Sequence, residues 1–310
     1  MLTKRSALTL LAGALALAGT ALPALAQAPE KLKVVATFSI LGDIVKNVGG
    51  DRIEVKTLVG PNGDAHVYSP TPADAKSLTE AKVVFTNGLK FEGWIARLIR
   101  SSGTKAPVVE AAGGVKALDG DDDHGQGHDH AHDHGALDPH AWQNVANARI
   151  YALNVRDALI RADEAGKAAY EANAAAYVAQ LDALDADIKA LVSRIPADKR
   201  RIITSHDAFR YFEAAYGIDF VSPQGVSTES EASAKDVATI IRQIKKDRIS
   251  AIFVENISDP RLMERVAKET GARIGEPVFS DALSDASGPA GTYIDLMRHN
   301  IKAFSTALSS

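Results

Sequence analysis

Short apolar runs rich in β-branched residues alternate with helical patterns along most of this 310-residue chain. Such alternation is typical of βα units, in which helices connect the parallel strands of a sheet. We predict strands at 33–38, 53–59, 83–86 and 107–109 in the first half, and at 201–205, 220–221, 251–254 and 277–280 in the second. The pattern therefore predicts an α/β fold, although it leaves the order of the strands open.

The alternation stops at residues 119–135, which are mostly Gly, Asp and His, and which we expect to form an irregular loop. Order resumes at 137–140, and helical sequence then continues to residue 195. It is broken near Asp163, so that 170–195 form a separate long helix. Its apolar residues recur at three- and four-residue spacing, which predicts one buried face of a long helix. We therefore expect an N-terminal lobe (27–165), a linking helix (166–196) and a C-terminal βα lobe (197–310).

Residues 1–26 have the pattern of a secretory signal peptide. Lys4 and Arg5 precede an apolar stretch, and Ala24-Leu25-Ala26 fits a small-x-small cleavage site. The alternative is an uncleaved N-terminal anchor. The chain has no cysteine, so we expect neither a disulfide nor a lipid attached through a cysteine. These features predict a freely diffusing periplasmic protein that is not lipid-anchored.

Without the leader, about 280 residues remain, enough for one large or two medium domains. Loss of Lys4 and Arg5 changes the formal net charge from −4 to −6. An acidic protein without a basic stripe is a poor candidate for nucleic-acid binding.

The nine histidines divide into two groups. Five lie in the Gly/Asp/His tract: His124, His128, His130, His132 and His134. Alternating His and Asp offers weak metal ligands on a flexible segment, so the tract could gather metal, or it could be a solvated loop without a role. His299 lies on the predicted last helix, where a structural role is expected.

Three other candidate ligands, His66, His206 and Asp281, follow predicted strands, and His140 opens the ordered segment after the tract. In open α/β sheets, ligands bind beyond the carboxyl ends of the strands. Three imidazoles and one carboxylate form a ligand set that suits tetrahedral zinc. Taken singly, however, each residue is more simply explained as an ordinary loop or capping residue.

Four motifs carry a resemblance to a known family: Gly63-Asp-Ala-His66-Val-Tyr-Ser-Pro70, Asp138-Pro-His140-Ala-Trp142, Thr204-Ser-His206-Asp-Ala-Phe209 and Phe279-Ser-Asp281-Ala-Leu283. Over nearly the whole mature chain, the sequence resembles the metal-specific solute-binding proteins of zinc and manganese ABC importers. The resemblance implies that His66, His140, His206 and Asp281 are the metal ligands. It also implies two Rossmann-like lobes bridged by a long rigid helix, with the metal in the interlobe cleft.

Family members that prefer manganese tend to carry Glu at the position of His206. Imidazole suits zinc, whereas carboxylate and water suit manganese, so we expect Zn²⁺ as the cargo, with Mn²⁺ or iron as alternatives. The expected function is high-affinity capture of Zn²⁺ and its delivery to an ABC permease. The protein is expected to be a monomer, and a periplasmic metallochaperone is a further expected partner.

We do not expect an enzyme, because four protein ligands leave no open position for an activated water. Two alternatives stay open: a periplasmic zinc-dependent hydrolase, although the chain has no His-Glu-x-x-His motif, and a metal buffer or adhesin-like surface protein.

Position alone suggests roles for several neighbours of the candidate ligands. Asp138 and Asp207 could accept the spare imidazole N–H of an adjacent histidine, or could simply cap a turn. Trp142 is expected to pack in the core near the site. Glu255 ends a predicted buried strand and could line the cleft.

Overall fold

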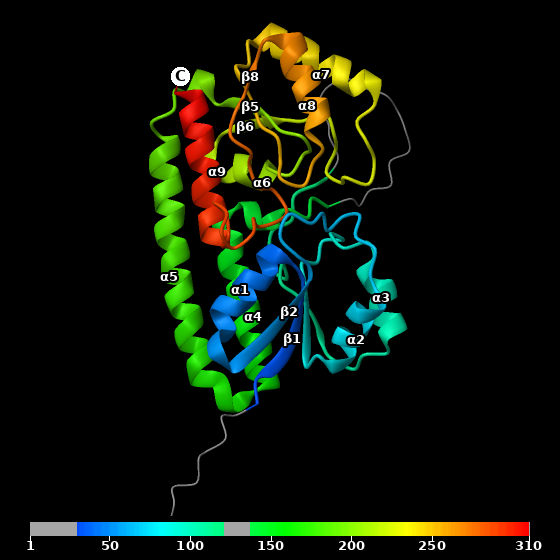
Figure 1. Ribbon diagram of the computed structural model, residues 1–310. Helices are drawn as coiled ribbons and strands as arrows, with labels where there is room; N and C mark the ends of the chain where they lie inside the picture. Colours follow the sequence, from blue (N-terminus) through cyan, green and yellow to red (C-terminus); the bar gives the residue numbers. More distant parts are fainter. Residues whose placement is uncertain (1–29, 121–136, 310) are drawn as a thin grey trace, which may run out of the picture. The chain divides into compact units, whose positions relative to one another are not determined.

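The computed structural model describes residues 30–120 and 137–309. They contain two four-stranded parallel sheets (Figure 1). The first has the order β2-β1-β3-β4 and comprises β1 (Leu32–Phe38), β2 (Ile53–Val59), β3 (Val83–Thr86) and β4 (Val108–Glu110). The second has the order β6-β5-β7-β8 and comprises β5 (Arg201–Ile203), β6 (Asp219–Val221), β7 (Ala251–Ile252) and β8 (Arg273–Ile274). The predicted two-lobed α/β fold is confirmed.

The predicted signal peptide (1–26) and the five histidines of the tract lie outside the described residues. No helix in the part of the chain that the structure describes is long and apolar enough to cross a membrane.

Nine α-helices are found among the described residues. They are α1 (Ser39–Gly49), α2 (Pro72–Glu80), α3 (Ile95–Ser102), α4 (Val145–Ala162), α5 (Lys167–Val192), α6 (Arg210–Tyr216), α7 (Ala234–Asp247), α8 (Pro260–Thr270) and α9 (Tyr293–Leu308). Capping boxes begin two of them, Thr71 with Asp74 at α2 and Ser233 with Asp236 at α7, as their sequences predict.

The central strands of the first sheet, β1 and β3, are buried because they are apolar on both faces. In β1, Val34 pairs with Val55 of β2 and Val83 of β3, and the last five residues of the strand are all buried. Such continuous apolar runs are expected of parallel strands that helices cover on both sides.

The long helix α5 contains 26 residues and spans about 39 Å at 1.5 Å per residue. It starts after a short 3-10 turn, Glu164–Gly166, at the predicted break. Its buried stripe includes Tyr177, Leu181, Leu184 and Ile188. The helix packs against α1, α4 and α9 and also contacts α6, so it runs beside helices of both lobes (Figure 1).

The apolar core forms two clusters. The larger extends from the first sheet through α4, α5 and α9 to β5 and β6 of the second sheet. The smaller lies between the second sheet and helices α7 and α8. The first lobe, the long helix and the adjoining part of the second lobe therefore share one core.

Three elements differ from the sequence-based prediction, and one of them is β8 (Arg273–Ile274), which was not predicted. Residues 277–280 do not form a strand: Val278 makes only an isolated bridge with Glu255. The reason is that side chains take the hydrogen bonds of this segment, since Phe279 N donates to Asn300 Oδ1 and Ser280 O accepts from Trp142 Nε1. Helix α3 was not predicted, because it buries only one residue, Leu98.

Candidate metal centre

The structure brings the four predicted ligands together from four separate segments. His66 follows β2, His140 precedes the 3-10 turn Ala141–Gln143, His206 follows β5, and Asp281 lies in the loop before α9. One ligand atom from each lies within 4.8 Å of all the others. His140, His206 and Asp281 are fully buried, and His66 is 6% exposed.

The distances between ligand atoms are short enough for one metal ion. His140 Nε2 lies 3.3 Å from His66 Nε2 and 3.4 Å from His206 Nε2. The Asp281 carboxylate lies 3.1, 3.6 and 3.3 Å from the Nε2 atoms of His66, His140 and His206. In a regular tetrahedral zinc site with bonds of roughly 2.0–2.1 Å, ligand atoms are about 3.3 Å apart. These five separations are thus close to those that zinc requires.

The Asp281 carboxylate shows that the site fits a cation. Both of its oxygens are buried, and neither has a hydrogen-bond partner. Leaving a buried carboxylate uncompensated is strongly unfavourable. Three imidazoles face it, and their Nε2 atoms are ligand atoms themselves. A divalent cation bound among them would satisfy all four side chains.

The carboxylate also perturbs the histidines around it. Burial lowers the pKa of His140, but the negative charges of Asp281 and Asp138 outweigh burial and raise it to about 9. For His206, burial likewise opposes the charges of Glu255 and Asp281, which raise its pKa well above 6.5. Burial would raise the pKa of Asp281, but the two histidines hold it well below 3.8. The metal-free site therefore favours protonated His140 and His206 beside an ionised Asp281.

His206 lies at the point where the connections of the second sheet change direction. The strand that follows β5 in the chain, β6, lies on one side of it, and β7 lies on the other. Such a switch point creates a crevice at the carboxyl ends of the strands. His206 follows β5 and Glu255 follows β7, so their side chains meet in this crevice.

Glu255 orients His206 through both of its carboxylate oxygens. Oε2 contacts His206 Nδ1, and Oε1 accepts a hydrogen bond of 2.9 Å from the His206 backbone N–H. This contact directs Nε2 towards the other ligands. Of the two roles considered for Asp207, acceptance of the His206 imidazole N–H is wrong, because Glu255 takes the Nδ1 side. The Asp207 carboxylate lies 3.9 Å from Arg210 Nε instead. In the sequence, the position of Glu255 at the end of a predicted strand was the signal that it could line the site.

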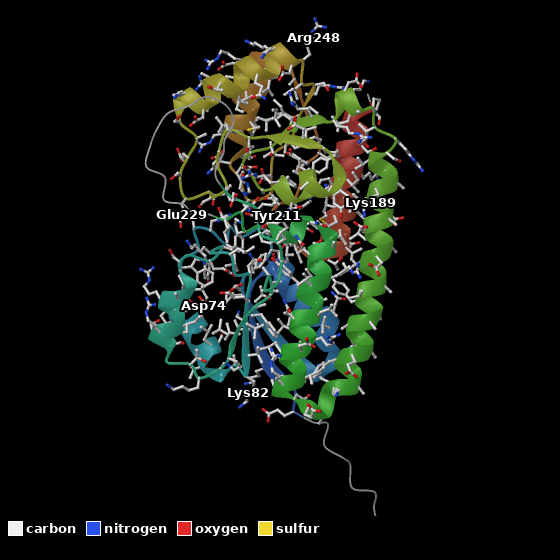
Figure 2. All side chains as sticks on the ribbon, turned by 180° about the vertical axis from the view of Figure 1, so that it is seen from behind. Asp74, Lys82, Lys189, Tyr211, Glu229 and Arg248 are labelled. Atoms are coloured by element: carbon white, nitrogen blue, oxygen red, sulfur yellow. The ribbon has the colours of Figure 1, made fainter. Side chains whose placement is uncertain are left out.

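Asp138 orients His140 and also caps its turn, so both roles considered for it are present. Its Oδ1 lies 2.7 Å from His140 Nδ1 and accepts from the His140 backbone N–H at 2.9 Å. From α6 of the second lobe, the Tyr211 hydroxyl donates to Asp138 O at 2.9 Å. Figure 2 shows Tyr211 in the middle of the described structure, between the two sheets.

Two residues that support His140 were missed at the level of sequence, Asn87 and Glu92. Asn87 directly follows β3, and its Nδ2 donates to Pro139 O at 2.9 Å. Glu92 Oε1 accepts from Asn87 N at 2.7 Å and contacts Thr37 Oγ1 at the end of β1. Burial raises the pKa of Glu92 to about 7. The strand-end position of Asn87 was the signal that could have identified it.

The Asp281 segment is held by residues of the first lobe. Ser280 O accepts from Trp142 Nε1 at 3.0 Å and from Gln143 Nε2 at 2.9 Å. Leu283 N donates to Ser39 Oγ at 2.9 Å. Trp142 is fully buried, as predicted. These bonds fix the backbone on both sides of Asp281.

His66 is positioned through its backbone and through ring contacts. Its N–H donates to Asp64 Oδ1 at 2.9 Å, and the preceding carbonyl, Ala65 O, accepts from Trp94 Nε1 at 2.7 Å. The imidazole packs edge-on against Phe91, with ring centroids 4.7 Å apart. His299 lies away from these residues on α9, where its Nε2 is 2.8 Å from Pro277 O, in line with the predicted structural role.

Known proteins similar to this chain bind metals. The sequence pattern of the family described as zinc-uptake complex component A, periplasmic, matches residues 34–307. The manganese-binding lipoprotein MntA of Halalkalibacterium halodurans is 35% identical over 280 residues, which are 90% of this chain and 89% of that protein.

Two solved structures are also similar. The periplasmic zinc binding protein TroA of Treponema pallidum has a TM-score of 0.82 and 30% identity, and the match covers 90% of this chain and 99% of that one. A manganese-bound mutant of a periplasmic metal binding protein from Candidatus Liberibacter asiaticus has a TM-score of 0.80 and 30% identity, covering 90% and 100%.

The relatives overturn one prediction about location. MntA and other relatives that match about 90% of this chain are named lipoproteins, so the prediction of a protein that is not lipid-anchored is wrong. That prediction rested on the absence of cysteine alone.

The comparisons also decide between the function classes. The matching family consists of solute-binding proteins of ABC importers, which are not enzymes, so the alternative of a zinc-dependent hydrolase is wrong. With the family pattern covering residues 34–307, this chain belongs to the zinc-uptake complex component A family, the metal-binding solute-binding proteins of ABC importers.

Proposed function

We propose that this protein captures Zn²⁺ with His66, His140, His206 and Asp281 and delivers it to the permease of an ABC importer. The observation that best supports the proposal is the Asp281 carboxylate, whose two buried oxygens lack hydrogen-bond partners while three imidazole nitrogens lie within 3.6 Å. A metallochaperone that supplies the ion is a further partner we propose.

The chemistry of the ligand set favours zinc. Imidazole nitrogen suits zinc, and zinc outranks manganese in the general affinity order of divalent metals. Asp281 adds a single negative charge, so the site with three neutral imidazoles carries one charge fewer than a site with a second carboxylate. Asp138 and Glu255 strengthen the imidazoles as ligands by accepting their Nδ1 protons.

Manganese is the second candidate cargo. Its support comes from relatives, since MntA is named for manganese binding and the Liberibacter protein has been solved with manganese bound. The carboxylate of Asp281 is compatible with either metal. Replacement of His206 separates the two candidates. At this position, histidine is expected in a zinc-binding member of the family and glutamate in a manganese-binding one.

We propose that the folded chain acts as two lobes, residues 27–165 and 197–310, joined by the helix within 166–196. Ligands from both lobes must meet for tight binding. Separation of the ligand segments would therefore weaken binding and release the metal to the permease.

The experiment that tests this function is the determination of Zn²⁺ and Mn²⁺ dissociation constants by competition with a chelator, for the wild type, His206→Ala and His206→Glu. Elemental analysis of the untreated protein identifies the native cargo. We expect tighter binding of Zn²⁺ than of Mn²⁺ in the wild type. His206→Ala should weaken Zn²⁺ binding by more than about 100-fold, beyond the range typical of changes around the ligands.

His206→Glu should narrow the preference for zinc, because it replaces a nitrogen donor by a hard oxygen donor and adds a negative charge. His299→Ala is the matched control, since this histidine contacts Pro277 O and the Phe279 ring but none of the four candidate ligands. Zn²⁺ affinity that is unchanged in His206→Ala would refute the proposed site. Manganese in the native protein, with a wild-type preference for Mn²⁺, would support the second candidate instead.

A further inference from the structure

The loop that carries His66 is bound to segments from the other half of the chain. Within this loop (residues 60–70), Asn62 N donates to Leu283 O at 2.9 Å. Its side-chain Oδ1 accepts from Asn256 Nδ2 at 3.0 Å. The loop therefore contacts both the Asp281 segment and the segment that follows β7.

Asp64 makes a different kind of connection, because its two oxygens have different partners. Oδ1 accepts a hydrogen bond of 2.9 Å from the backbone N–H of His66. Oδ2 accepts a hydrogen bond of 2.7 Å from Thr228 Oγ1. A single carboxylate thus joins a metal ligand of the first lobe to the segment between β6 and α7. Figure 2 shows Glu229, the neighbour of Thr228, at the level where the two lobes meet.

Thr228 is in turn connected to His206. Its carbonyl accepts from Gln224 Nε2 at 3.3 Å, and the backbone of Gln224 pairs with that of His206 in an isolated parallel bridge. Gln224, Thr228 and Asp64 therefore form a continuous path between the backbones of His206 and His66.

This path is accessible to water, unlike the ligands themselves. Asp64 and Thr228 are only partly buried, and they line a cavity of 490 Å³ that also reaches Ser205, the residue before His206. Water in this cavity can compete for the hydroxyl and the carboxylate when the two separate. The hydrogen bond can therefore break without leaving a polar group buried and unsatisfied.

Among the three histidines, His66 depends most on its loop. His140 and His206 are fully buried and have carboxylates at Nδ1. His66 is slightly exposed, lies in a segment without regular structure, and precedes Val67, which is 51% exposed. Its ring position therefore follows the position of the loop.

We propose that Asp64 is a positioning residue that couples its contact with Thr228 to the placement of His66, so that breakage of the Asp64–Thr228 hydrogen bond is a step in metal release. This inference rests on the proposed function, because it takes His66 as a metal ligand. Asp64 itself does not bind the metal.

The test is the rate at which Zn²⁺ leaves the loaded protein on mixing with excess chelator, measured for Thr228→Val, Asp64→Ala and the double variant. Thr228→Val removes only the hydroxyl and should raise the dissociation rate roughly tenfold, the scale of one lost hydrogen bond to a charged group. Asp64→Ala should raise it at least as much. In the double variant, the valine should add nothing further, because its partner is already absent.

The matched control is Thr239→Val on α7, where the hydroxyl donates to Lys235 O and accepts from Arg242 Nη2, both within its own helix. It should leave the rate unchanged. A second readout needs no metal: amide hydrogen exchange over residues 61–70 of the metal-free protein should be faster in Thr228→Val than in the wild type.

Wild-type dissociation and exchange rates in Thr228→Val, or fully additive effects in the double variant, would overturn the inference. These results differ from a failure of the proposed function, which His66→Ala tests separately. If His66→Ala binds Zn²⁺ as tightly as the wild type, the proposed site is wrong. If it loses tight binding while Thr228→Val behaves as the wild type, only the role of Asp64 is wrong.

Discussion

The backbone N–H of His206 and its Nδ1 both contact the carboxylate of Glu255, the N–H at 2.9 Å. Because these two contacts come from the same residue, they fix the plane of the imidazole as well as the position of its backbone. Asp138 makes the same pair of contacts with His140. Two of the three histidines are therefore oriented before any metal binds, which reduces the ordering that binding requires.

Replacement of Glu255 by Gln should weaken Zn²⁺ binding by roughly 10- to 100-fold, the usual effect of changing a group that orients a ligand. The side chain keeps its size, but the imidazole loses an anionic acceptor for its Nδ1 proton. Chelator competition measures the change. Glu269→Gln is the control, since Glu269 forms an exposed ion pair with Arg265 on α8. Equal affinities in Glu255→Gln and Glu269→Gln would contradict the role assigned to Glu255.

That role could not be derived from the sequence. Glu255 and His206 are 49 residues apart, and they meet only because β5 and β7 are neighbours in the sheet. Hydrophobic patterns reveal the strands but leave their order open, so the pattern placed Glu255 at a strand end without identifying its partner. Asp207 was a candidate because it is adjacent in sequence, but Glu255 occupies the Nδ1 side of the His206 ring.

The candidate ligands could be identified from sequence because the motifs around them resemble those of a metal-binding family, and not from their positions alone. His66, His206 and Asp281 each follow an apolar run, and the quoted motifs around them are specific. The segment before Asp281 shows the limit of this reasoning, since its apolar residues suggested a strand. Asn300 and Trp142, which take its backbone hydrogen bonds, are too distant in sequence for any local pattern to indicate.

The metal-free protein should lose stability between pH 7 and 9 while its affinity for Zn²⁺ rises. The charges of Asp281 and Asp138, acting against burial, raise the pKa of His140 from 6.5 to about 9, and that of His206 is raised as well. A raised histidine pKa stabilises the folded state fully below 6.5, and this contribution disappears as the pH rises through the raised value. Zn²⁺ must displace the same protons, so its affinity rises over the same interval.

Two buried carboxyl groups also make the stability of the protein depend on pH, but at lower pH values than the histidines. Burial raises the pKa of Glu92 from 4.5 to about 7 and that of Asp43 from 3.8 to about 6. These groups ionise first in the unfolded state, so their raised pKa values lower stability as the pH rises from about 4 to about 7. Calorimetric melting of the metal-free protein from pH 7 to 9.5, with chelator competition at each pH, isolates the histidines. A melting temperature that rises over this interval would contradict the assignment.

Deletion of Asp121–His134 should leave one tight Zn²⁺ site and remove only weaker binding. None of the four candidate ligands lies in this range. The residues on either side are already adjacent: Asp119 and Leu137 form an antiparallel bridge, and Asp138 N donates to Leu118 O at 2.9 Å. A short linker can therefore close the gap without moving His140. Titration calorimetry counts the sites, and loss of the tight one would mean that a tract histidine belongs to it.

The most direct test of the proposed site is a crystal structure of the zinc-loaded protein with anomalous diffraction data collected on both sides of the zinc absorption edge. We predict one strong peak bonded to Nε2 of His66, His140 and His206 and to a carboxylate oxygen of Asp281, at roughly 2.0–2.2 Å. A tightly bound zinc that lacks any of these four ligands, or that is bonded to a histidine of the tract instead, would contradict the proposed site.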